Sequence, residues 1–177
     1  TWIKRSKILQ SHQSNQNSFM ALFGHTAAGA GSYECLLFDN GDDNLSVWIY
    51  GTGGSGAVTA LSNAVYRDVN GWYNIVWVSD TTNATGADRW KFYINGVDVA
   101  DTTKAGGFGT NNIASISQNH DGFINSSSYE VTIGSQRSYN TDSGRFFDGY
   151  MSQCVMVDGQ ALDASYFGFE DPMTGTW

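Results

Sequence analysis

Aromatic rings beside amide, hydroxyl and ammonium groups are the features of this sequence that could support binding chemistry. They lie on two strand-like runs, with Ser46, Trp48 and Tyr50 on one and Lys91, Tyr93 and Asn95 on the other. In an extended chain alternate side chains share a face, so each set projects opposite the apolar row of its own run. Rings stack on the apolar face of a pyranose while polar neighbours bond its hydroxyls, which makes these residues candidates for carbohydrate binding. The alternative is that this face packs against a second sheet or a neighbouring subunit, because aromatic residues dominate cores and interfaces too.

The sequence lacks the closely spaced carboxylates that glycoside hydrolases with a β-sandwich fold use. Such an enzyme faces two carboxyl groups across the bond it cleaves, because one protonates the leaving oxygen while the other attacks or activates water. The glutamates are Glu34, Glu130 and Glu170, and none has an acidic neighbour two or four residues further on. We therefore expect no catalytic residues and a protein that is not an enzyme.

The sequence carries no strong metal-binding pattern. The three histidines stand far apart in predicted loops, at His12, His25 and His120. Without a His-Glu-x-x-His or Cys-x-x-Cys pattern, solvated histidines are expected rather than a zinc site. Asp39, Asp42 and Asp43 offer the oxygen ligands that calcium takes, but the tip of a hairpin favours Asp and Asn in any case. No cofactor is therefore expected, and calcium at this tip is the alternative.

The charge balance excludes several classes of partner. A net charge of -8 and a pI near 4.5 repel a phosphate backbone, so nucleic acid is not an expected partner. No run approaches the roughly 18 apolar residues of a membrane span. Charged residues make only 15% of the chain, and it has 21 glycines and one proline. This composition is typical of strands and turns rather than of amphipathic helices.

Length and cysteine content predict one domain. A chain of 177 residues can bury a sizeable core, so we expect a single domain over residues 1–177. The chain starts at Thr1 without a Met and inside a strand-like run, which favours a piece of a longer protein. Cys35 and Cys154 both fall in predicted strands, and small buried thiols are favoured over a single disulfide bridge.

A central stretch of residues 71–100 organises the predicted strands. Residues 72–79 carry apolar bulk on both faces, which is typical of an interior strand, and residues 90–95 form its partner before the turn-forming pair Asn95-Gly96. Residues 100–129 lose all periodicity and predict a long interaction loop. Other strands are predicted at residues 2–8, 19–23, 33–39, 45–50, 57–61, 64–66, 130–133 and 146–157, with one helical turn at residues 161–167. Many short strands separated by turns predict a two-sheet antiparallel β-sandwich or jelly roll.

Two passages add a resemblance to this pattern. The central hairpin, with Trp72-Tyr73 before it and Asn95-Gly96-Val97 after it, resembles the laminin-G-like or concanavalin-A-like jelly-roll superfamily. Four later motifs are similar, in the same order, to the C-terminal signature of jelly-roll proteins of tailed bacteriophages. They are Phe147-Asp148-Gly149-Tyr150, Val157-Asp158-Gly159-Gln160-Ala161-Leu162, Ser165-Tyr166-Phe167-Gly168 and Thr174-Gly175-Thr176-Trp177. The sequence departs from that signature at Gln153, often acidic in those proteins, and at Cys154, often apolar.

The resemblance implies a non-enzymatic structural protein of the virion surface, on the phage tail or the capsid exterior. In the first interpretation it is a lectin-like adhesion module of a tail fibre, receptor-binding protein or capsid fibre, which contacts host surface glycans. In the second it is a capsid decoration or tail-assembly protein with a purely structural role. Its expected partners are other virion proteins and a host glycan, and a homo-oligomer, with a trimer favoured, is expected.

Overall fold

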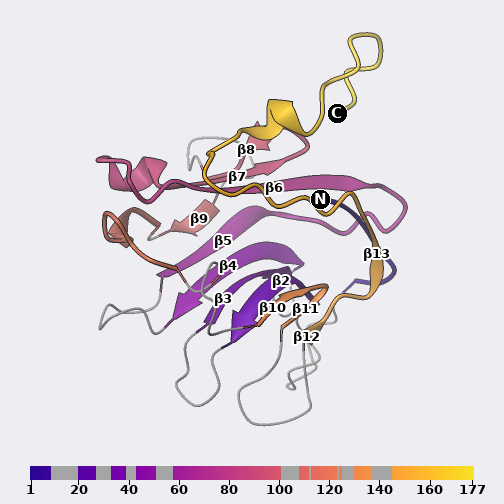
Figure 1. The fold of residues 1–177 in the computed structure, drawn as a ribbon. Helices are drawn as coiled ribbons and strands as arrows, with labels where there is room; N and C mark the ends of the chain where they lie inside the picture. Colours follow the sequence, from indigo (N-terminus) through magenta and orange to yellow (C-terminus); the bar gives the residue numbers. More distant parts are fainter. Residues whose placement is uncertain are drawn as a thin grey trace.

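The chain folds as two antiparallel sheets that face each other, as Figure 1 shows. The computed structural model describes residues 1–8, 20–26, 33–38, 43–50, 58–100, 108–111, 113–122, 124, 130–136 and 145–177. Within these residues the only helical elements are three single 3₁₀ turns, η2 (Gly86–Asp88), η3 (Ile113–Ser115) and η4 (Ala164–Tyr166). The all-β sandwich predicted from the sequence is confirmed.

Each sheet has two edge strands, which are the first and last in its pairing order. The five-stranded sheet runs β13 (Gly149–Ser152), β1 (Trp2–Arg5), β6 (Tyr73–Ser79), β7 (Trp90–Ile94) and β8 (Val97–Asp98). The six-stranded sheet runs β10 (Val131–Ile133), β2 (Met20–Thr26), β3 (Tyr33–Phe38), β4 (Asn44–Tyr50), β5 (Val58–Val65) and β9 (Phe108–Asn111). A separate pair is formed by β11 (Ser135–Gln136) and β12 (Arg145–Phe146).

The core lies between the two sheets and follows the predicted alternation of side chains. The register of β6 on β7 sets Trp77 opposite Phe92, with ring centroids 5.5 Å apart. The buried apolar residues that the five-stranded sheet turns toward the core are Ile3, Ile75, Trp90, Phe92 and Ile94. They meet Leu36, Phe38, Leu45, Val47 and Ile49 of the six-stranded sheet. The interior position of β6, between β1 and β7, is also as predicted.

The outward face of the six-stranded sheet carries a second, smaller apolar cluster. Cys35 and Leu37 are fully buried there and pack against the half-buried Trp48. Arg145 of β12 places its guanidinium carbon 5.0 Å from the centroid of the Trp48 ring. Gln136 of β11 packs against β2, because a Cβ on Gly24 would lie 3.0 Å from the Gln136 Cβ. The β11–β12 pair therefore covers part of this face.

Three predicted elements differ in the structure. The predicted last strand at residues 146–157 is divided into β12 and β13, and Gln153, with φ of 51°, ends β13 in the left-handed region. The two short strands predicted at residues 57–66 are one strand, β5. Part of the predicted long loop forms β9, which pairs with β5 through its backbone and needs no alternating apolar pattern.

Candidate functional site

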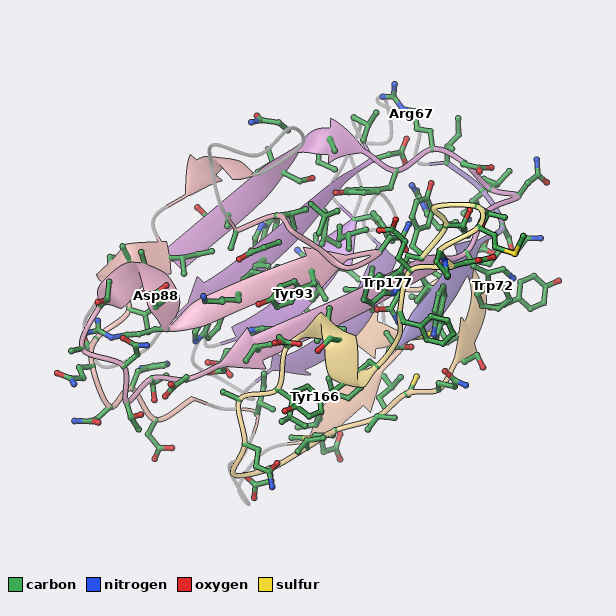
Figure 2. All side chains as sticks on the ribbon, turned by 90° about the horizontal axis from the view of Figure 1, so that it is seen from above. Arg67, Trp72, Asp88, Tyr93, Tyr166 and Trp177 are labelled. Atoms are coloured by element: carbon green, nitrogen blue, oxygen red, sulfur yellow. The ribbon has the colours of Figure 1, made fainter. Side chains whose placement is uncertain are left out.

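The outward face of the five-stranded sheet holds the group of polar side chains best placed for binding. Trp90, Phe92 and Ile94 point into the core, so Lys91 and Tyr93 must point outward from β7. The pairing of Tyr93 with Asp98 on β8 brings that carboxylate to the same face. In Figure 2, Tyr93 lies near the middle of the sheet.

The C-terminal segment, residues 153–177, crosses part of this outward face, as Figure 1 shows. The Trp177 ring packs closely against Gly96 and Gly168 and so fixes the end of the segment. A Cβ added to Gly96 would lie 2.3 Å from the ring, and a Cβ added to Gly168 would lie 2.8 Å from its Nε1. On β6 the outward Asn74 and Val76 are buried. On β7 the outward Lys91 and Tyr93 remain half-buried. The face is therefore covered over β6 and partly open over β7.

Charged groups surround Tyr93 on this open part. The Lys91 Nζ lies 3.4 Å from a carboxylate oxygen of Asp88. Burial acts to lower the pKa of Lys91, but the hydrogen bond and charge of Asp88 outweigh it and raise that pKa. Burial raises the pKa of Tyr93, and the charges of Asp98 and Asp163 raise it further. The face therefore presents the Tyr93 phenol beside Lys91, Asp98 and Asp163, with Asp88 paired to Lys91.

This set of groups suits a ligand rich in hydroxyls. The phenol of Tyr93 can both donate and accept a hydrogen bond, and the carboxylates can accept from neighbouring hydroxyls. The ring adds an apolar surface on which a sugar ring can stack. Because β7 is held between β6 and β8, these side chains are presented by a rigid scaffold.

The structure divides the residues predicted for carbohydrate binding between two sheets. Lys91 and Tyr93 share the outward face of the five-stranded sheet, whereas Trp48 lies on the outward face of the six-stranded sheet, in the cluster with Cys35 and Leu37. Asn95 lies in the β7–β8 turn with φ of 48°, and its side-chain oxygen accepts a hydrogen bond of 2.8 Å from the backbone N–H of Asn74. The Tyr50 side chain lies outside the described residues. The open part of the outward face therefore combines only Lys91 and Tyr93 from the predicted set.

Three aspartates of this face were not predicted as site residues. Asp98 could have been found, because the Asn95-Gly96 turn sets the hairpin register that places it opposite Tyr93. Asp88 lies three residues before Lys91, in η2. Asp163 is distant in sequence and reaches the face through the C-terminal segment, so no local pattern signals it.

The aspartates considered for calcium have another role where they are described. The carboxylate of Asp43 is buried and accepts hydrogen bonds from the guanidinium groups of Arg5 and Arg67. Asp39 and Asp42 lie outside the described residues. In the part of the chain that the structure describes, no group of three or more His, Cys, Asp or Glu side chains could hold a metal ion.

The histidines and cysteines depart from two expectations. His25 belongs to β2 rather than to a loop, and His120 is only 12% exposed, with its Nε2 3.5 Å from a carboxylate oxygen of the buried Glu34. The thiols are free, Cys35 in the interior as predicted and Cys154 at the surface. Cys154 is exposed because β13 ends at Ser152, two residues before it.

Comparisons with known proteins return no relative. No protein family, curated protein or solved structure matches the chain. Among the described residues, no helix is both long enough and apolar enough to span a membrane. The site is therefore interpreted from its own geometry.

Proposed function

We propose that the protein is a non-enzymatic structural protein of a tailed-bacteriophage virion, a lectin-like adhesion module that contacts host surface glycans. The observation that carries this proposal is the position of Tyr93, half-buried on a rigid sheet beside Lys91, Asp98 and Asp163. An aromatic ring with hydrogen-bonding groups around it, on a fixed strand, is the arrangement that recognises a sugar. Its place would be the virion surface, on a tail fibre or capsid fibre.

The phage part of the proposal rests on the four C-terminal motifs. In the structure three of these motifs supply residues that hold the C-terminal segment in place, namely Gly149, Gly168 and Trp177. A Cβ on Gly149 would lie 2.2 Å from the carbonyl oxygen of Lys4, so only glycine fits beside β1. Gly168 and Trp177, from two different motifs, pack against each other. The resemblance thus concerns residues with an architectural role, which suits a structural protein of the virion.

The carboxylates of the site suit binding better than acid catalysis. A carboxyl group that protonates a leaving oxygen needs a raised pKa. Asp163 has the opposite shift, because its side chain accepts hydrogen bonds from the hydroxyl and the backbone N–H of Ser165, which lower its pKa. Asp88 is engaged with Lys91. Glu34 is buried beside Gly122, away from solvent.

Substitution of Tyr93 tests the proposal. We expect the wild-type chain to bind host surface polysaccharide on a glycan array and in calorimetry. Tyr93→Ala should lose roughly two- to tenfold in affinity, since one stacked ring contributes roughly 0.5–1.5 kcal/mol. The melting temperature should change little, because Tyr93 points away from the core. Tyr93→Phe should keep part of the affinity.

Two matched variants serve as controls. Tyr166→Ala removes another tyrosine that is 68% exposed and should leave glycan affinity unchanged. Trp48→Ala should also leave it unchanged but cost about 2 kcal/mol of stability, because Trp48 packs on Cys35 and Leu37. Equal binding by Tyr93→Ala and wild type, or no binding to any glycan, would reject the adhesion site.

A specific observation favours the second candidate, a capsid decoration or tail-assembly protein. The C-terminal segment exposes large apolar side chains that a protein partner could cover. They are Val155, Met156, Tyr166, Phe169 and Met173, exposed by 60% to 93%. Binding to isolated capsid or tail protein, with no signal on a glycan array, would support this role.

A further inference from the structure

The turn between β5 and β6 carries an asparagine followed by a glycine, Asn70-Gly71. Asn70 is exposed, and its backbone N–H donates to a carboxylate oxygen of Asp68 at 2.8 Å. A Cβ on Gly71 would lie 2.6 Å from the other oxygen of that carboxylate. Because a larger residue at position 71 would displace the Asp68 side chain from the turn, the turn favours glycine after Asn70.

The two groups of this pair that can react with each other are both unengaged. In the part of the chain that the structure describes, neither the side-chain amide of Asn70 nor the backbone N–H of Gly71 has a hydrogen-bond partner. Asparagine is one of the thermolabile residues, and glycine has no Cβ to hinder approach to its nitrogen. Rotation of the exposed Asn70 side chain can therefore bring its Cγ to the nitrogen of Gly71.

A second Asn-Gly pair, Asn95-Gly96 in the β7–β8 turn, is held in place by its surroundings. The Oδ1 of Asn95 accepts a hydrogen bond of 2.8 Å from the backbone N–H of Asn74, and the N–H of Asn95 donates to the carbonyl oxygen of Asn74 at 2.9 Å. The Trp177 ring packs against Gly96. The side chain that would have to rotate and the glycine that would have to receive it are therefore both fixed here.

We infer that Asn70 is a modification site of this protein, at which the chain deamidates through a cyclic imide. The backbone nitrogen of Gly71 attacks Cγ of Asn70, so that a C–N bond forms between them and the Cγ–Nδ2 bond breaks. The side-chain nitrogen leaves as ammonia and carries away the proton that the Gly71 nitrogen loses. Water then opens the imide at Cγ, which gives aspartate, or at the backbone carbonyl carbon, which gives isoaspartate. The only co-reactant is water.

The modification changes the turn that leads into the central strand of the five-stranded sheet. Either product adds a carboxylate two residues from that of Asp68. Isoaspartate also lengthens the backbone by a methylene group between Asp68 and β6, which begins at Tyr73. The backbone N–H of Asp68 donates to the hydroxyl of Tyr73 at 3.1 Å, so the fit of the turn on β6 depends on this length. The inference does not depend on the proposed function.

Peptide mapping of the full wild-type chain by mass spectrometry tests the inference. After incubation of the folded protein at mildly alkaline pH, the tryptic peptide of residues 68–89 should gain the mass of deamidation at Asn70 and separate into aspartate and isoaspartate forms. The peptide of residues 92–104 carries Asn95 and should react about tenfold more slowly or less, because its reaction requires local opening of the β7–β8 turn. Asn70→Gln should remove the modification from the first peptide and leave the rate at Asn95 unchanged.

The denatured chain is the matched control. In urea the contacts that hold Asn95 are lost, and Asn70 and Asn95 should deamidate at similar rates, since each precedes a glycine. A rate at Asn70 no higher than the rate at Asn95 in the folded protein would overturn the inference. Aspartate at position 70 without isoaspartate would overturn it equally, because opening of a cyclic imide gives both products.

Discussion

At the level of single residues, a buried ion pair joins the two sheets. Arg5 of β1 and Asp43, next to β4, are both essentially inaccessible to solvent, and the Arg5 guanidinium lies 4.3 Å from the centroid of the Phe38 ring. Arg67 also contacts the Asp43 carboxylate, at 3.2 Å, but is half exposed. The residue types alone could not show this arrangement, because Asp43 fits a hairpin tip, a metal ligand and an ion pair equally well.

Removal of the charge of Asp43 should be costly. Asp43→Asn keeps the side-chain size and tolerates the φ of 57°, but it leaves the Arg5 guanidinium buried without its counter-charge. We expect a loss of about 3 kcal/mol in the free energy of unfolding, measured by urea denaturation. Arg67→Ala should cost less than about 1 kcal/mol, because solvent screens that exposed partner. Equal stability of Asp43→Asn and wild type would contradict this role.

Tyr66 should make stability depend on alkaline pH. Burial raises its pKa to about 12, and in the unfolded chain the phenol ionises near pH 10. The stabilisation is complete below pH 10 and is lost as pH rises from 10 toward 12, because the unfolded state releases the proton first. Between these pH values we expect wild type to lose roughly 2 kcal/mol more than Tyr66→Phe in denaturant titrations. Parallel curves for the two proteins would show that Tyr66 does not titrate in this way.

At the level of elements, the C-terminal segment depends on the seating of Trp177. A turn over residues 171–176 reverses the chain before Trp177. The backbone N–H of Asp171 donates to the carbonyl oxygen of Thr176 at 2.7 Å, and the N–H of Gly175 donates to the carbonyl oxygen of Asp171 at 2.8 Å. The Trp177 ring then occupies the space that side chains at Gly96 and Gly168 would need. These glycines therefore act by leaving room for the ring.

Gly96→Ala and Gly159→Ala separate this packing from backbone strain. Both glycines have positive φ, 75° and 77°, but a Cβ at Gly159 meets no atom within 4 Å, whereas one at Gly96 meets Trp177. Gly96→Ala should displace the ring and raise amide exchange of residues 160–177 by about tenfold or more, as should Trp177→Ala. Gly159→Ala should cost only the strain of about 1 kcal/mol. Unchanged exchange in Gly96→Ala would show that the segment is held elsewhere.

At the level of the whole molecule, the two outward faces of the sandwich differ in the part of the chain that the structure describes. The outward face of the five-stranded sheet is polar and acidic around Tyr93, whereas part of the outward face of the six-stranded sheet is packed beneath β11–β12. The proposed glycan site lies on the first of these faces, where Tyr93 is half-buried. The proposed site therefore needs no part of the six-stranded sheet.

Alternation of apolar residues was enough to predict the sandwich, the β6–β7 hairpin and the inward row of Leu45, Val47 and Ile49. A period of two is a local property of an extended chain, so it can be recognised in the sequence. Sequence periodicity did not show which outward face stays open, because that depends on segments distant in sequence, such as β12 over Trp48 and Trp177 against Gly96. The separation of Trp48 from Tyr93, and the approach of Asp163 to Tyr93, therefore emerged only from how the two sheets pack and where the chain crosses them.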